Sequence, residues 1–131
     1  MCIFCKIISG EIPSHKIFED EKTLAFLDIK PVHPGHVLVI PKKHFQNLEE
    51  INPEDLTALI QTVKRIGGLL KDKLQVEGYN VITNNDAVAG QIVPHLHFHI
   101  IPRVTGDGLP LWSGCDYQSG EADQILEKLK N

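Results

Sequence analysis

The stretch that decides the fold is His95-Leu96-His97-Phe98-His99-Ile100-Ile101, in which histidines alternate with apolar residues. Successive side chains of an extended strand point to opposite faces, so this alternation predicts a half-buried β-strand with two different faces. The three histidines are expected on one face, about 7 Å from one to the next. The apolar residues between them are expected to point into a core.

Three interpretations of this histidine-bearing face are open. It could be a solvated face, although strict alternation of three uncommon residues is hard to reach by chance. It could bind a metal ion, but neighbouring histidines on an extended strand converge poorly on one ion. It could also be a binding site, because three imidazoles at this spacing line a patch about as large as a phosphate with its substituents.

The segments around this strand predict an α+β domain. Strands are expected at residues 15–19, 23–28, 37–40, 79–83 and 95–101, and short terminal helices at residues 3–9 and 121–130. The connections are short, and the pattern contains only one long helix. An antiparallel sheet of about five strands with helices packed on it is therefore expected.

The long helix is predicted to begin after Asn52. Asn52 is a good N-cap, Pro53 suits the first helical position, and acidic residues fill the first turn. Apolar residues then recur every three or four positions and form one stripe: Leu56, Leu59, Ile60, Val63, Ile66, Leu70 and Leu74. Gly67-Gly68 inside this helix costs about 2 kcal/mol of propensity, which indicates close packing or a bend.

Composition and charge narrow the classes of function. The 131 residues are 42% hydrophobic and 23% charged, which predicts a single domain over residues 1–131 and excludes disorder. The net charge is −4 and no basic stripe is present, so no nucleic-acid partner is expected. The longest aliphatic run, residues 37–40, is too short for a membrane span, and the first residues do not resemble a signal peptide. A cytoplasmic protein is therefore expected.

Cys2 and Cys5 form a Cys-x-x-Cys pair near the start of the chain. In a cytoplasmic protein this spacing indicates metal or redox chemistry rather than a disulfide. No βαβ pattern surrounds the pair, which argues against thioredoxin-like redox chemistry, whereas two free thiols remain an alternative. For a metal site, His44 and His95 are the candidate further ligands, although spacing alone does not assign them. Cys115 is expected to be an ordinary thiol.

Residues 95–101 resemble the signature of the histidine triad (HIT) family, in which histidine alternates with apolar residues in the order His-φ-His-φ-His-φ-φ. Residues 2–13, residues 35–44 and the approach from Gly90-Gln91 to His95 resemble the Hint-like branch of that family. The similarity covers most of the chain. It implies the HIT-like α+β fold and a nucleotide hydrolase or transferase.

The resemblance implies that His97 attacks the α-phosphorus of a bound nucleotide, with a purine base expected. A covalent nucleotidyl-histidine forms, and water then releases the nucleoside monophosphate. A neutral imidazole is a good nucleophile near pH 7, and covalent catalysis divides one difficult displacement into two easier steps. His99 and His36 are the expected donors to the phosphoryl oxygens, and His95 completes the triad.

The resemblance also implies six substrate-binding residues: Asp28, Asn84, Gly90, Gln91, Ile92 and Val93. The Asp28 carboxylate is expected to accept hydrogen bonds from the two ribose hydroxyls, although an ordinary charge at a strand end is the alternative. Asn84 and Gln91 are expected to contact phosphate or to stabilise the substrate loop, and turn chemistry would equally explain them. The family often has a hydroxylated or acidic residue where this chain has Ile92, so only a backbone donor remains there.

The resemblance further implies that Cys2, Cys5, His44 and His95 hold one structural Zn²⁺ in a closed tetrahedral site. The expected substrate is a nucleoside phosphoramidate or a related nucleotide ester. A Fhit-like dinucleoside polyphosphate hydrolase and a non-catalytic nucleotide-binding module are the alternatives. A homodimer is expected, with the long helix and a neighbouring strand at the interface. Trp112 could cover the substrate or lie at that interface.

Overall fold

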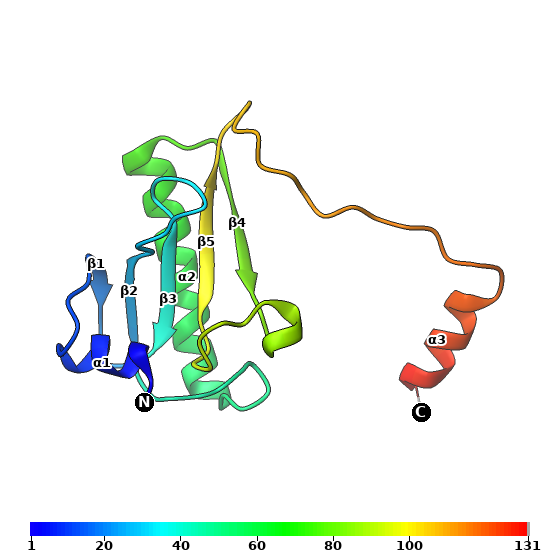
Figure 1. Cartoon of the computed structure of the whole chain (residues 1–131), viewed down its shortest axis with the longest axis horizontal. Coiled ribbons are helices and arrows are strands. Elements are labelled where there is room, and N and C mark those ends of the chain that lie inside the picture. The colour runs from blue at the N-terminus through cyan, green and yellow to red at the C-terminus, as the bar shows by residue number, and fades with distance from the viewer. Residues whose placement is uncertain (131) are drawn as a thin grey trace.

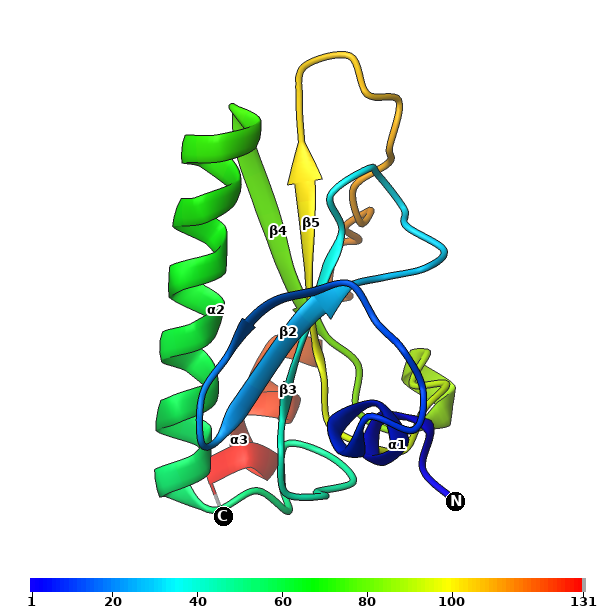
Figure 2. The ribbon, with the colours of Figure 1, turned by 90° about the vertical axis from the view of Figure 1, so that its left-hand side faces the viewer.

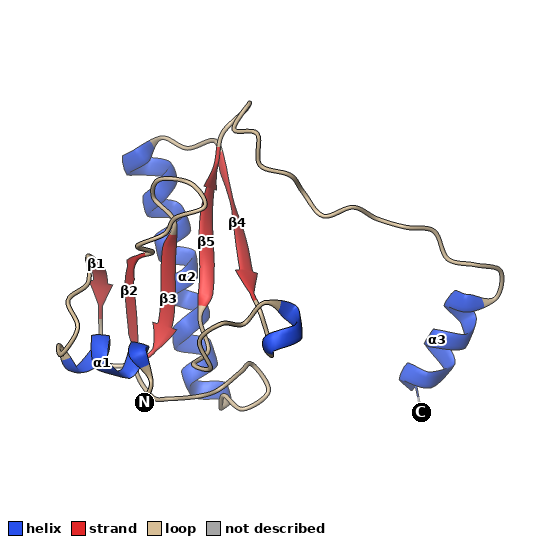
Figure 3. Ribbon diagram, in the orientation of Figure 1, coloured by secondary structure: helices blue, strands red, loops and turns tan. Residues whose placement is uncertain are grey.

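The computed structural model of the chain describes residues 1–130, which form a five-stranded antiparallel sheet with three α-helices (Figures 1 and 3). The strands lie in the order β1-β2-β3-β5-β4. The elements are α1 (Ile3–Ser9), β1 (Lys16–Glu19), β2 (Thr23–Leu27), β3 (Val37–Pro41), α2 (Pro53–Leu74), β4 (Gly78–Thr83), a 3₁₀ turn (Ala87–Ala89), β5 (Phe98–Arg103) and α3 (Glu121–Lys130). The predicted α+β class is confirmed.

Two apolar layers flank the sheet, because α1 and α2 lie on opposite faces of it (Figure 2). The layer under α2 contains Leu96, Phe98 and Ile100 from the histidine-bearing stretch. The layer on the α1 side contains Phe4, whose ring contacts His97. The stretch therefore has the predicted alternation, with its apolar side chains facing α2 and its histidines on the opposite face.

Helix α2 begins as its sequence predicts, with the Asn52 side chain accepting a hydrogen bond from the backbone N–H of Asp55 at 2.8 Å. Its buried apolar stripe is narrower than predicted, because Ile60 and Leu74 are 46% and 55% exposed. The helix runs unbroken through its two glycines. The ring of Tyr79 fills the space that a side chain at residue 67 would need, so close packing accounts for the first glycine.

The histidine-bearing strand begins and ends later than predicted. Residues 95–97 lie outside the ladder, because the N–H of Leu96 donates to the carbonyl of Phe45, at 2.7 Å, in a loop. The predicted end of the strand at residue 101, just before Pro102, is wrong, since β5 continues to Arg103. The last pair between β3 and β5 is at Ile100, and Pro102 pairs only with β4. Strands tolerate proline where they have one neighbour. Each of the other four strands differs from its predicted range by one residue at one end and agrees at the other.

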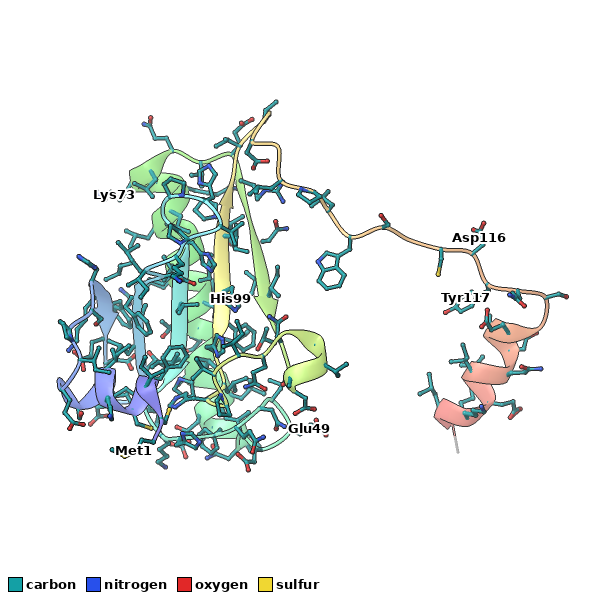
Figure 4. All side chains as sticks on the ribbon, in the orientation of Figure 1. Met1, Glu49, Lys73, His99, Asp116 and Tyr117 are labelled. Atoms are coloured by element: carbon teal, nitrogen blue, oxygen red, sulfur yellow. The ribbon has the colours of Figure 1, made fainter. Side chains whose placement is uncertain are left out.

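Beyond Val104 the chain leaves the sheet, and α3 lies well apart from it (Figure 1). Figure 4 shows Tyr117 in the extended segment that leads to α3, far from His99 on β5. No residue of α3 is buried, and Trp112 is 86% exposed. None of the helices in residues 1–130 combines the length and the apolar character that crossing a membrane requires.

Candidate active site and candidate metal centre

A cavity of about 450 Å³ opens on the α1 face of the sheet, beside His97 and His99. Most of its wall is apolar and comes from α1, from the end of β2 and from the segment before β5. Asp28 adds a carboxylate, and the predicted substrate residues Ile92 and Val93 also line it. A larger cavity of about 620 Å³ lies on the α2 side, but none of the three triad histidines lines it. His97, His99 and Asp28 therefore gather at the first cavity.

The three triad histidines share this face but have different neighbours. The ring centroids of His97 and His99 are 5.0 Å apart, and both residues line the cavity. The ring of His95 lies instead 4.9 Å from that of His44 and is fully buried. The triad is thus divided between a cavity and a second cluster of polar side chains.

The ring of His97 is held in one tautomer. Its Nδ1 lies 2.7 Å from the carbonyl oxygen of His95. A carbonyl oxygen only accepts hydrogen bonds, so Nδ1 carries the hydrogen and Nε2 keeps its lone pair. Burial lowers the pKa of His97, which keeps the ring neutral at pH 7. The residue is 6% exposed, so the lone pair on Nε2 stands at the cavity rather than in bulk water.

A second chain of hydrogen bonds, here called the histidine relay, joins the backbone of Val32 to His36 and His99. The Val32 N–H donates to Nδ1 of His36 at 3.1 Å, so the hydrogen of that neutral ring lies on Nε2. This Nε2–H donates to Nδ1 of His99 at 2.9 Å, which leaves His99 with its own hydrogen on Nε2. Burial and the neighbouring imidazoles lower the pKa of His99 to about 4. The relay therefore makes His99 a neutral N–H donor.

Asp28 stands at the edge of this relay. Its Oδ2 lies 3.7 Å from Nε2 of His36, and its Oδ1 accepts the backbone N–H of Lys30 at 2.9 Å. Burial lowers the pKa of His36, against the opposing attraction of the Asp28 carboxylate. One carboxylate oxygen is thus fixed by the turn, while the other is directed toward the histidines.

Three predicted substrate residues lie outside the cavity. The Gln91 side chain accepts from the N–H of Asp86 at 2.8 Å and donates to the carbonyl of Gln46 at 2.6 Å, so it ties two loops together. Asn84 lies beside Gly90, whose φ of +97° is a conformation that favours glycine. Of the two roles considered for Gln91, stabilising the loop is the one its contacts favour.

The metal cluster consists of Cys2, Cys5, His44 and His95, whose ligand atoms all lie within 4.8 Å of one another. Nδ1 of His95 lies 3.3 Å from Sγ of Cys2 and 3.7 Å from Sγ of Cys5, and Nδ1 of His44 lies 3.5 Å from Sγ of Cys5. Zinc–ligand distances of about 2.0–2.3 Å in a tetrahedron place ligand atoms about 3.5 Å apart. The spacing therefore fits one Zn²⁺.

The protonation of His95 also fits a metal ligand. Its Nε2 donates to the carbonyl of Pro41 at 2.9 Å, which leaves the lone pair on Nδ1, facing the two sulfurs. Burial lowers the pKa of His95 to about 4, so the ring is neutral. A metal ligand needs this neutral form with a free lone pair.

A second group of possible ligands does not fit a metal. Asp28, His36 and His99 also bring ligand atoms within 4.8 Å of one another. The hydrogen that the Val32 amide places on Nε2 of His36 occupies the space between the two rings. Two lone pairs therefore do not converge there, and in the described residues only the metal cluster has the right donor set.

Sequence reasoning missed most of the apolar cavity wall, and Phe4 is the example with a contact to a triad histidine. Phe4 of α1 lines the cavity, and its ring meets that of His97 edge to face, with centroids 5.1 Å apart and planes at 84°. The residue stands between the two cysteines, and the sequence predicts only that it lies in a short helix at residues 3–9. The signal available in the sequence was its position inside the Cys-x-x-Cys pair.

The five-stranded antiparallel sheet, with two triad histidines facing one cavity, agrees with the resemblance noted in the sequence. The family model described as the HIT domain matches residues 9–106. The chain therefore belongs to the HIT family, as its sequence predicts.

Two relatives support this assignment over nearly the whole chain. An uncharacterized HIT-like protein of Methanocaldococcus jannaschii is 49% identical over 130 residues, which cover 99% of each chain. Adenosine 5'-monophosphoramidase HNT1 of Candida albicans is 43% identical over 136 residues, covering 98% of this chain and 89% of the relative.

Solved structures support the fold. A HIT family protein from Bacillus subtilis matches with a TM-score of 0.89 and 44% identity, covering 98% of this chain and 94% of that structure. A zinc-bound histidine triad family protein from Mycobacterium smegmatis matches with a TM-score of 0.80 and 36% identity, covering 98% and 95%.

Proposed function

We propose that the protein is a nucleotide hydrolase of the nucleoside phosphoramidase type, which cleaves the bond between the α-phosphorus of a purine nucleotide and an amine. The observation that carries this proposal is the hydrogen bond from Nδ1 of His97 to the carbonyl of His95. It leaves a neutral ring with its lone pair on Nε2 at the wall of a cavity that also holds an N–H donor and a carboxylate.

In the first step, Nε2 of His97 forms a bond to phosphorus while the phosphorus–nitrogen bond of the substrate breaks. The amine leaves and takes a proton from water. The nucleotidylated ring is positively charged, so its Nδ1–H binds the carbonyl of His95 more strongly than before. We expect the N–H of His99 to stabilise the charge on the phosphoryl oxygens.

In the second step, water attacks the same phosphorus and loses a proton to solvent. The bond from phosphorus to Nε2 breaks, and the electron pair returns to the ring. The carbonyl of His95 keeps the hydrogen on Nδ1, so the nucleotidylated ring stays positively charged. A positively charged imidazole is a good leaving group, so the intermediate remains reactive toward water. The products are a nucleoside monophosphate and the neutral His97.

The cavity supports a nucleoside as the bound part of the substrate. Its apolar wall, which includes Phe4, Ile7 and Phe26, suits the faces of a purine base. The carboxylate of Asp28 at the same cavity can accept two adjacent ribose hydroxyls. Because one relative is an adenosine 5'-monophosphoramidase, adenosine is the nucleoside to use in a first substrate.

The proposal is tested by incubating the protein with adenosine 5'-monophosphoramidate, quenching with denaturant at alkaline pH, where a phosphorus–imidazole bond survives, and measuring the mass of the intact chain. One added adenylyl group is expected in the wild type and none in His97→Ala. His15→Ala is the matched control, since His15 is an exposed histidine that is not among the residues lining the cavity, and it should behave as the wild type. Faster turnover of diadenosine tetraphosphate would favour the dinucleoside polyphosphate alternative, and absence of any adduct would favour a non-catalytic binder.

We also propose that Cys2, Cys5, His44 and His95 hold one structural Zn²⁺. Four protein ligands complete a tetrahedron and leave no position for substrate, so the ion would supply stability rather than a reactive water. It would tie α1 and the loop at residue 44 to the start of the triad. A cytoplasmic location is consistent with this site, because thiols stay reduced there.

A homodimer is the assembly that we propose. Strand β4 is an edge of the sheet, so its outer side has no partner strand in the described residues. Val81 on this strand and Ile60 on the long helix are 41% and 46% exposed. Paired two-fold copies would cover such an edge. Light scattering after size-exclusion chromatography should give twice the chain mass, and a monomer would exclude this assembly.

A further inference from the structure

The ring of Phe4 connects the metal cluster to the proposed nucleophile. It is 6% exposed and packs edge to face against both His97 and His95, with centroids 5.1 and 5.8 Å apart and planes at 84° and 75°. A third such contact, to Phe26, has centroids 5.7 Å apart. The ring therefore touches one histidine of the metal cluster and the neighbouring histidine at the cavity.

The position of Phe4 is fixed by the two cysteines that flank it. Cys2 caps α1, and its sulfur accepts the backbone N–H of Cys5 at 3.4 Å. Both sulfurs also lie beside Nδ1 of His95. Because Phe4 lies between these two anchored residues on a single helical turn, its ring has little freedom to move away from the imidazoles.

The ring of His97 needs such a contact. The terminal torsion of a histidine side chain has a broad energy minimum, so the torsion alone does not fix the ring plane. One hydrogen bond, from Nδ1 to the carbonyl of His95, holds one edge of the ring. A perpendicular aromatic ring restricts the rotation that this bond still allows, and aromatic pairs favour the edge-to-face arrangement.

We propose that Phe4 is a positioning residue, which holds the plane of the His97 ring so that Nε2 faces the substrate phosphorus. The metal cluster acts through it, because the cysteines hold Phe4 in place. The inference rests on the proposed function for its kinetic consequence, but the orientation of the His97 ring is a property of the free protein and can be measured without substrate.

The experiment compares Phe4→Leu with Leu24→Ala. Leu24 is a fully buried member of the same apolar cluster but does not line the cavity, so its truncation controls for general loss of stability. At saturating adenosine 5'-monophosphoramidate, formation of the adenylyl adduct should be about three- to tenfold slower in Phe4→Leu, as expected for loss of one aromatic pair. Leu24→Ala should form the adduct at the wild-type rate.

Nitrogen NMR of the His97 ring reports which ring nitrogen carries the hydrogen, and a measurement of activity does not report this. The wild type should give one protonated Nδ1 and one bare Nε2. In Phe4→Leu the ring is free to turn Nδ1 away from the carbonyl of His95, so both signals should move toward the average of two tautomers. Replacing both cysteines by serine should shift the wild-type signals in the same way and add little to the shifts of Phe4→Leu.

Unchanged His97 signals in Phe4→Leu, or an equal loss of rate in Leu24→Ala, would overturn the positioning role. If the wild type forms no adduct at all, the proposed function fails, and the NMR comparison still decides whether Phe4 positions the ring.

Discussion

The metal cluster, and the histidine relay together with Asp28, are two groups of metal-ligating side chains, each with its ligand atoms within 4.8 Å of one another. They differ in the backbone group that forms a hydrogen bond with one ring nitrogen, which belongs to His95 in the metal cluster and to His36 in the relay. Nε2 of His95 meets a carbonyl oxygen, whereas Nδ1 of His36 meets the N–H of Val32. The first contact leaves a lone pair facing the two thiols, and the second places a hydrogen between two rings. Ligand-type residues in one place therefore indicate a metal only when the backbone leaves their lone pairs free.

The largest effect should come from the residue that stands between the two clusters. His97→Ala removes the proposed nucleophile, so phosphoramidate hydrolysis should fall by at least about a thousandfold. The zinc content should stay at one ion per chain, because His97 is not in the metal cluster. Steady-state kinetics and metal analysis of the same sample test both statements. Residual hydrolysis above one tenth of the wild-type rate would remove His97 from the mechanism.

Removing a ligand of the metal cluster should have the next largest effect. His44→Ala leaves three ligands and should lose the bound zinc, with a loss of at least about 2 kcal/mol in the free energy of unfolding. His36→Ala is the matched control, since it removes a histidine of the relay and should retain zinc. Elemental analysis and denaturant unfolding provide the measurements. Full zinc content in both His44→Ala and Cys2→Ser would contradict the ligand set.

Breaking the relay should lower activity without touching the metal. In His36→Ala, Nδ1 of His99 loses its donor and the ring can adopt either tautomer, so kcat should fall by about tenfold. KM should change less, because His36 is not one of the cavity-lining residues. A kcat that stays within twofold of the wild type would show that the relay has no catalytic consequence.

The smallest effect concerns the dependence of stability on pH. Burial lowers the pKa of His99 to about 4 in the folded chain, below the ordinary value of about 6.5 in the unfolded chain. The stabilising contribution is complete above pH 6.5 and is lost as the pH falls toward 4, because the unfolded state then binds more protons. At pH 5.5 the loss relative to pH 7.5 should be about 1 kcal/mol after allowance for partial exposure.

His99→Asn provides the control for this prediction. The variant should lose less stability than the wild type over the same pH range, because it lacks the buried titrating ring. Urea unfolding at both pH values gives the comparison. Equal losses in the two proteins would mean that other groups, including the metal ligands, account for the whole dependence.

The alternation of histidines and apolar residues between the two faces of the sheet was predictable, because it depends only on the period of two in an extended segment. The start of α2 was predictable because Asn52 and Pro53 act locally. The start of β5 was not, because it depends on a hydrogen bond from Leu96 to a distant loop residue, Phe45. The tautomer of His36 was equally hidden, since the deciding amide of Val32 comes close only through the loop between β2 and β3.

The segment from His95 to Ile100 serves packing and chemistry at once, and this limits how the chain can vary. Deleting one residue just before it would turn every side chain over, placing imidazoles beneath α2 and Leu96 and Phe98 in the cavity. Such a deletion would prevent both folding and the proposed reaction. The extended segment before α3 has no such coupling, so changes in its length should be tolerated. Changes in length close to the triad should not be tolerated.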